Sequence, residues 1–117
     1  MTEKLDRLRE LTIGRKRTPT RKILRFKAQE YEIRSPTVGE RNKIQQKATS
    51  EDGRFNEQKF IVAAIIELTY VPKTEEKVFS DADWDVMMNC DVGSYVDVFA
   101  PDILEICFVH FDQKKSN

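Results

Sequence analysis

The sequence predicts one mostly helical α+β domain, in which a small antiparallel β-hairpin is followed by about four helices packed round an apolar central helix at 56–70. Three observations support this fold class. Residues 60–71 form an apolar run that only Glu67 and Thr69 interrupt, residues 23–33 alternate apolar and charged side chains, and helix-start signals recur after the hairpin. A chain of 117 residues is long enough to bury one core.

The central helix is predicted from residue 56 to residue 70. Asn56 is a suitable N-cap, Glu57 places an acid in the first turn, and Pro72 is expected to end the segment. A buried strand is the alternative, because isoleucine and valine favour strands, but the length of the run and the pair Ala63–Ala64 favour a helix. Because the helix is apolar on almost every side, the rest of the chain must cover it. It is too short to cross a membrane, which takes ~20 apolar residues.

Residues 1–22 are predicted to be a basic, mobile arm. Within the arm, residues 2–12 can form a short amphipathic helix with Leu5, Leu8 and Leu11 on one side. The linker that follows contains a glycine and a proline as helix breakers and has nothing to bury. We therefore expect the arm to stand apart from the core.

A single globular domain is expected at 23–110, followed by a loose C-terminal tail at 111–117. The domain opens with the hairpin, whose strands each carry one apolar face, formed by Leu24 and Phe26 on the first strand and by Tyr31 and Ile33 on the second. Its turn lacks an Asn-Gly pair or any glycine, which leaves the register open. On the other face, two basic residues of one strand can lie opposite two acids of the next. These residues are Arg25 and Lys27, with Glu30 and Glu32.

Capping boxes mark two further helices, because a hydroxyl residue and an acid three positions later can satisfy each other's backbone amides. The first should be a polar surface helix, and the second should bury Trp84, onto which Phe79 can pack as a hydrophobic staple. A last helix begins near residue 94, and Pro101 inside it predicts a kink or a restart. The capping pairs are Thr37 with Glu40 and Ser80 with Asp83.

The charged residues make up 34% of the chain and sum to zero, but they are unevenly placed. Residues 1–27 carry ten Lys and Arg against three acids, so this part is +7 and residues 28–117 are −7. Such a layout suggests that the two ends contact different things, or that the arm folds back on the acidic body. The candidate basic residues of the arm are Arg15, Lys16, Arg17, Arg21 and Lys22.

The sequence offers no catalytic, metal or cofactor site. Asp81, Asp83 and Asp85 resemble the opening of a calcium loop, but the glycine and the glutamate that the loop requires further on are replaced by valines. Acids in the first turn of a helix explain them better. Cys90 and Cys107 have no metal-ligand spacing, so we expect free buried thiols in a reducing cytoplasm. We expect no enzyme, and the absence of an apolar signal core makes secretion unexpected.

Nucleic-acid binding through the basic segment 15–27 is the alternative function. Lysine and arginine can neutralise phosphates and release counterions. However, no aromatic residue is interleaved between Arg15 and Lys22 for base stacking, and no helix-turn-helix pattern is present. A solvated or partner-docking arm is the favoured interpretation.

Several motifs in this order resemble the tail assembly chaperones of long-tailed phages and prophages. A hairpin leads into a helix opened by Pro36-Thr37 and Glu40, and the apolar helix ends in Tyr70-Val71-Pro72-Lys73. A Val-Phe-Ser-x-x-Asp-Trp helix start follows at 78–84, and the last helix carries Tyr95-Val96-Asp97 and Ile103-Leu104-Glu105-Ile106. The resemblance covers residues 20–108.

The resemblance implies a non-catalytic protein that binds and solubilises the tape measure protein while the tail is built. An unassembled tape measure protein exposes apolar helical stripes, which a small charged domain could cover in a helix-in-groove mode. Methionines and aromatic residues are the adaptable apolar surfaces available, although ordinary core packing explains them equally well. The candidate partner-binding residues are Met87, Met88, Tyr95, Phe99, Ile103 and Phe108.

The resemblance also implies a location and further forms of the protein. We expect it in the cytoplasm of the bacterial host, absent from the mature virion and from membranes, with itself as a possible oligomeric partner. The family often makes a longer product by ribosomal frameshift, and Lys114-Lys115 could be encoded by an A-rich slippery stretch.

Overall fold

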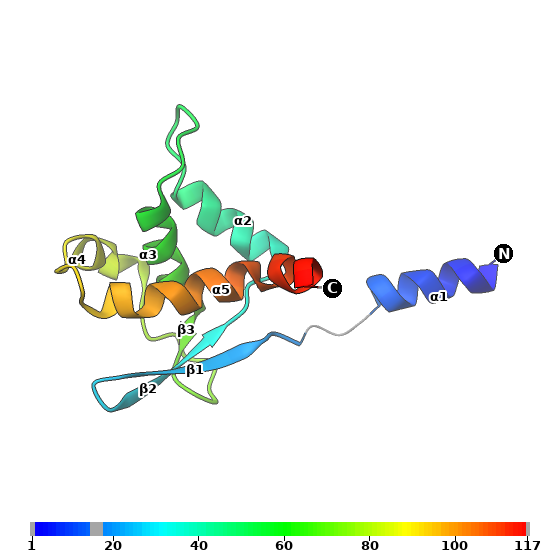
Figure 1. Cartoon of the computed structure of the whole chain (residues 1–117), viewed down its shortest axis with the longest axis horizontal. Helices are drawn as coiled ribbons and strands as arrows, with labels where there is room; N and C mark the ends of the chain where they lie inside the picture. The colour runs from blue at the N-terminus through cyan, green and yellow to red at the C-terminus, as the bar shows by residue number, and fades with distance from the viewer. Residues whose placement is uncertain (1, 15–17, 117) are drawn as a thin grey trace.

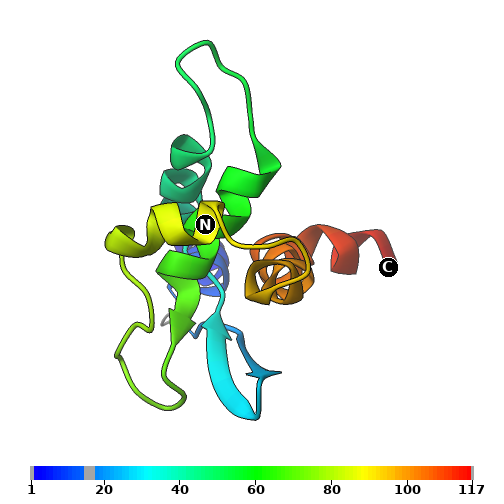
Figure 2. The ribbon, with the colours of Figure 1, turned by 90° about the vertical axis from the view of Figure 1, so that its left-hand side faces the viewer.

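The computed structural model describes residues 2–14 and 18–116, and side chains among them up to residue 108. Three strands form one antiparallel sheet in the order β1-β2-β3. Helices α2 to α5 gather on one side of the hairpin, and α1 stands apart from the body (Figures 1 and 2). This confirms the predicted, mostly helical α+β fold. The elements are α1 (Thr2–Thr12), β1 (Arg21–Phe26), β2 (Gln29–Arg34), α2 (Val38–Lys47), α3 (Glu57–Leu68), β3 (Thr69–Tyr70), η1 (Asp81–Asp83), α4 (Trp84–Met88) and α5 (Tyr95–Ser116).

Helix α3 is the buried centre of the molecule. Eight of its twelve residues are buried, and it packs against α2, α4, α5 and β3. Asn56 caps it as predicted, because its side-chain oxygen accepts a hydrogen bond from the Lys59 amide at 2.9 Å. Full burial of one large apolar side chain is worth roughly 1.5–3 kcal/mol, so α3 contributes much of the free energy of folding. No helix within the described residues is both long and apolar enough to span a bilayer.

The C-terminal end of α3 differs from the prediction. The helix ends at Leu68, and Thr69–Tyr70 form β3, which pairs with Ile33 and Glu32 of β2. The predicted end at residue 70 is therefore wrong, and Pro72 does not terminate the helix. Thr69 is β-branched and adopts an extended conformation, with φ −99° and ψ 124°. Pairing with β2 satisfies backbone groups at a position that is fully buried.

The hairpin closes through a two-residue turn at Lys27 and Ala28. Both residues have positive φ, 50° and 64°, and this left-handed geometry suits the twist of the two strands even without a glycine. The resulting register places Arg25 opposite Glu30, and their side chains form the predicted ion pair at 3.5 Å. The second predicted pairing is wrong, because Lys27 belongs to the turn and Glu32 binds other partners.

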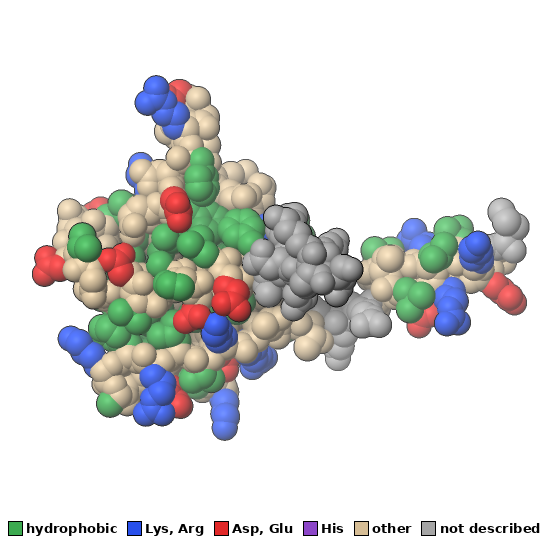
Figure 3. Space-filling view, in the orientation of Figure 1, with side chains coloured by type: hydrophobic (Ala, Val, Ile, Leu, Met, Phe, Trp, Pro, Cys, Tyr) green, Lys and Arg blue, Asp and Glu red, His purple; other side chains and the backbone are tan. Residues whose placement is uncertain are grey.

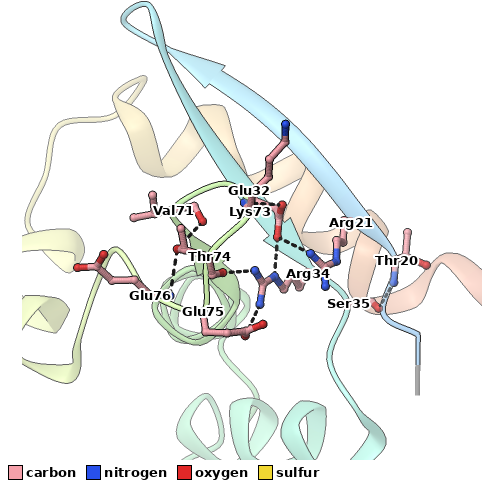
Figure 4. Close-up of polar contacts among 10 residues, drawn as sticks. All are labelled: Thr20, Arg21, Glu32, Arg34, Ser35, Val71, Lys73, Thr74, Glu75 and Glu76. Carbon is pink, nitrogen blue, oxygen red and sulfur yellow. Dashed lines mark hydrogen bonds and ion pairs between the residues drawn. The ribbon is translucent and has the colours of Figure 1, made fainter. Parts of the chain in front are cut away.

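A buried ion pair ties the sheet to the loop that follows β3 (Figure 4). The Arg34 guanidinium donates to Glu32 at 2.6 Å, to Glu75 at 2.7 Å, and to the carbonyl oxygen of Thr74. Its central carbon lies 3.9 Å from the centre of the Tyr70 ring, in a cation–π contact. Arg34 therefore holds β2, β3 and the loop together.

The Glu32 side chain is held as an anion although it is only 4% exposed. Burial is the largest influence and opposes ionisation. However, hydrogen bonds from Arg34 and the Lys73 amide, together with the charges of Arg34 and Arg21, hold the pKa of Glu32 below its ordinary value. Because the folded pKa is lowered, this carboxylate stabilises the fold above the ordinary carboxyl pKa of about 4.3. That contribution is lost as the pH falls through the folded pKa.

Replacing Arg34 should strongly destabilise the protein. Arg34→Ala leaves the Glu32 charge buried and unpaired, so we expect the free energy of unfolding at neutral pH to fall by about 3–5 kcal/mol. Arg54→Ala is the matched control, because Arg54 is 87% exposed and pairs with Asp52 at the surface. It should cost less than about 0.5 kcal/mol. Urea unfolding measures both, and equal small losses would contradict the role given to Arg34.

The predicted helix starts are confirmed in their capping contacts. The Glu40 amide donates to Thr37 Oγ1 at 3.0 Å, and the Thr37 amide donates to the Glu40 carboxylate at 2.8 Å. The Ser80 amide donates to the Asp83 carboxylate at 2.9 Å. These contacts satisfy amides that a helix terminus leaves without intrahelical partners.

Helix α5 runs from Tyr95 to Ser116 with Pro101 inside it. Of the predicted kink or restart at the proline, the restart is therefore wrong. Phe99 and Ile103, on the two sides of the proline, are both buried. Their packing holds both turns against the core and offsets the hydrogen bond that proline cannot donate. The predicted loose tail, 111–117, falls on backbone that continues this helix, except for its last residue, which lies outside the described residues.

The boundary between arm and body lies before residue 22. Helix α1 confirms the helix predicted at 2–12, and none of its residues is buried. Two hydrogen bonds link Thr20 to Ser35, so Arg21 and Lys22 belong to β1 and not to a free arm. The mobility of the arm stays a prediction. Its other three candidate basic residues lie outside the described residues: Arg15, Lys16 and Arg17.

Candidate functional site

A hollow of about 190 Å³ opens between the tip of the hairpin and the first turns of α5. Figure 3 shows hydrophobic side chains gathered on this face of the molecule, over α5 and along the hairpin. We name the hollow the aromatic groove, because all of its lining residues are aromatic: Phe26, Tyr31, Phe79, Tyr95 and Phe99. Pockets for small molecules usually measure ~300–1,000 Å³, so this groove is better suited to side chains of a protein partner.

The five rings pack against one another in a fixed arrangement. The centre of the Phe99 ring lies 6.4 Å from that of Phe26 and 5.3 Å from that of Tyr31, both edge to face. The Phe79 ring stacks on Tyr95 at 6.4 Å. Phe99 is 1% exposed and forms the floor, whereas the other four rings are half-buried and form the walls. Each aromatic pair adds about 0.5–1.5 kcal/mol beyond its buried area. These contacts hold the rings in place in the unbound protein, so the groove is preformed.

Local sequence rules place each ring. Strand alternation puts Phe26 on the same face as Leu24, which lies directly opposite Tyr31 in the hairpin register. Tyr95 and Phe99 are four residues apart and so lie on one face of α5. Phe79 immediately precedes the capping box that opens η1, which fixes its direction of entry.

Three of the five groove residues are absent from the predicted partner-binding set. Strand alternation assigned Phe26 and Tyr31 to the apolar face of the hairpin, and the capping motif assigned Phe79 to pack on Trp84. Neither rule shows which other element of the fold packs against these side chains. The available signal was the aromatic character of these positions, since aromatic residues are enriched at protein interfaces.

The predicted partner-binding residues do not form one surface. Tyr95 and Phe99 line the groove, but Met87 and Ile103 are buried in the core. Phe108 stacks on the buried Phe60 ring at 5.6 Å, in the second half of α5. The sixth predicted residue, Met88, is half-buried on α4.

The α4–α5 side of the groove is acidic. Between Lys77 and Lys114 the sequence has eight acids and no lysine or arginine. Burial, together with Cys90 and Asp83 nearby, raises the pKa of the Tyr95 phenol. Four acids of this segment form no ion pair with a lysine or arginine that the structure describes: Asp83, Asp85, Asp91 and Asp97.

The hairpin side of the groove carries positive charge, and part of it is already paired. The Lys27 ammonium lies 5.5 Å from the centre of the Phe26 ring. Lys22, a predicted residue of the basic arm, bridges to Asp102 at 2.5 Å and to Glu105 at 3.4 Å. The hydrogen bond to Asp102 is the main reason that the pKa of Lys22 is raised. Lys22 therefore joins β1 to α5 instead of serving as a free basic group.

The calcium-like aspartates serve separate structural purposes. Asp81 binds Lys47 at 3.1 Å, and Asp83 accepts the capping hydrogen bond from Ser80. Asp85 lies in the first turn of α4, where an acid complements the positive end of the helix. Within the part of the chain that the structure describes, no three side chains of His, Cys, Asp or Glu come together as a metal site.

Comparisons with protein-family models, with characterised proteins and with solved structures found no match for this chain. The molecule is a small α+β protein with a preformed aromatic groove that has one acidic side.

Cys90 provides a chemical test of the region beside the groove. Cys90 is half-buried, whereas Cys107 is buried, and burial raises the pKa of the Cys107 thiol to about 12. Because the thiolate is the reactive form, we expect iodoacetamide at neutral pH to modify Cys90 and to spare Cys107 until the protein unfolds. Mass spectrometry of the folded protein should show one modified site. Preferential modification of Cys107 would contradict the packing described here.

Proposed function

We propose that this protein is a non-catalytic phage tail assembly chaperone that binds and solubilises the tape measure protein. The motifs at 36–40, 70–73 and 78–84 support the family assignment. The aromatic groove is the structural observation that supports a binding role. Phage or prophage origin and a cytoplasmic site of action in the bacterial host belong to the same proposal.

The groove suits an apolar stripe on a partner helix. Side chains at positions i, i+3 and i+4 of such a helix can enter a short hydrophobic groove together. Tyrosine and phenylalanine present large, rigid contact areas and lose little conformational entropy on binding. The walls are half-buried and the floor is buried, so little of the protein must reorganise when a helix binds.

The acidic side of the groove adds selectivity. Asp83 lies near Tyr95, and its carboxylate also accepts the capping hydrogen bond from the Ser80 amide. Electrostatic complementarity favours partners of opposite charge and speeds their encounter. We therefore expect the bound helix to carry lysine or arginine beside its apolar stripe.

The alternative, nucleic-acid binding through residues 15–27, has less support. Arg21 lies 3.5 Å from Glu32, Lys22 binds two acids of α5, and Arg25 pairs with Glu30. Such pairing reduces the positive charge available for phosphates, and phosphate neutralisation provides most of the affinity of non-specific nucleic-acid binding.

The proposal can be tested by co-expression with the long helical protein encoded beside this gene. The wild-type chain should keep that protein soluble and co-purify with it in several copies. Tyr95→Ala, which opens the wall of the groove, should reduce the captured amount at least about tenfold, the effect of losing ~1.4 kcal/mol of binding free energy.

Val38→Ala is the matched control for this experiment, because Val38 is 77% exposed at the start of α2 and lies outside the groove. It should capture as much as the wild type does. If the long protein stays insoluble with the wild-type chain, the chaperone proposal is wrong. If Tyr95→Ala captures as much as the control, the groove is not the binding surface.

A further inference from the structure

Helix α1 presents an apolar face that the body of the molecule does not cover. Leu5, Leu8 and Leu11 are 58%, 52% and 53% exposed. Their spacing of three residues places them along one side of the helix. A helix of this length is marginal in water by itself, and its stability normally depends on packing of its apolar face. We therefore expect the leucine face to pack against another surface.

The charges of α1 indicate the kind of surface. With 3.6 residues per turn, Lys4, Arg7 and Arg9 lie beside the leucine face. The three acids of the helix lie together on the opposite side: Glu3, Asp6 and Glu10. The leucine face therefore matches an apolar groove with an acidic border, and would be repelled by a basic one. The aromatic groove has this combination where Asp83 lies near Tyr95.

In this structure the helix of the same chain lies away from its own groove (Figure 1). Thr18 and Pro19 lie beside Pro36 and Ile106, at the end of β1 opposite to Phe26. Figure 1 shows α1 directed away from the hairpin tip. With no residue of its own α1 among the lining residues, the groove is open to the helix of a second molecule.

We propose that α1 of one copy docks with its leucine face in the aromatic groove of a second copy. The helix lies along the Tyr95 side of the groove, where its basic side chains approach Asp83. Because helix and groove are different surfaces, the contact is heterologous and can continue from copy to copy. This inference does not depend on the identity of any other partner of the groove.

Mixing two complementary variants tests this contact in the full-length protein. Leu8→Asp removes the helix surface, and Tyr95→Ala removes the groove surface. The wild type should show a mass that rises with concentration in sedimentation velocity, whereas each variant alone should lose this self-association and remain monomeric. An equal mixture should form a one-to-one dimer, because it contains one intact helix and one intact groove.

The controls separate this contact from changes in folding. Phe79→Ala is a second groove variant and should behave as Tyr95→Ala does. Val38→Asp should self-associate as the wild type does, because the exposed Val38 lies outside both surfaces. Every variant should keep a cooperative thermal unfolding transition in circular dichroism, because Leu8 is exposed and the two groove side chains are only half-buried.

Several results would overturn the proposal. The proposal is wrong if the wild type is monomeric at all concentrations. Self-association that Leu8→Asp abolishes but both groove variants retain would instead indicate a helix-to-helix dimer. Failure of the mixed variants to form a dimer would also contradict the contact. Binding of α1 to anionic phosphatidylglycerol vesicles without any self-association of the protein would contradict it as well. A leucine face with basic residues beside it can also lie on a membrane surface.

Discussion

The burial of α3 is the constraint on which the rest of the structure depends. A helix that is apolar on nearly every side cannot remain in water, and eight of its residues are removed from solvent by the elements around it. Covering it requires α2 and α4 as well as the long α5. Strand β3 follows α3 directly and pairs with β2, so the sheet lies at the C-terminal end of α3. The positions of the other elements follow from these contacts.

The aromatic groove is a consequence of this arrangement. The hairpin extends beyond β3, because β3 has only two residues whereas β1 and β2 have six each. The part nearest the turn is therefore free to meet the start of α5, and aromatic side chains from both elements fill the junction. The contacts of Arg34 with Glu32 and Glu75 hold the opposite part of the sheet in place (Figure 4). A rigid frame thus positions the half-buried rings.

Features set by nearby residues could be predicted from the sequence. The capping pairs at Thr37 and Ser80 depend on contacts three residues apart, and both are present. Hairpin alternation likewise placed Tyr31 on the correct face. Features set by distant contacts could not be predicted in this way. The change from helix to strand at Thr69 depends on the free edge of β2, and the continuity of α5 through Pro101 depends on packing against α3. The groove needs three separate segments to meet, so the sequence supplied only two of its five residues as partner-binding candidates.

Chemical-shift mapping can show whether the aromatic groove accepts an apolar helix. The isotope-labelled protein would be titrated with a helical peptide from the tape measure protein that carries basic residues beside an apolar stripe. If the groove binds the peptide, the largest changes occur at Phe26, Tyr31, Phe79, Tyr95 and Phe99, with a smaller one at Asp83. Changes confined to α2 or to the N-terminal arm, with the groove signals unmoved, would contradict binding in the groove.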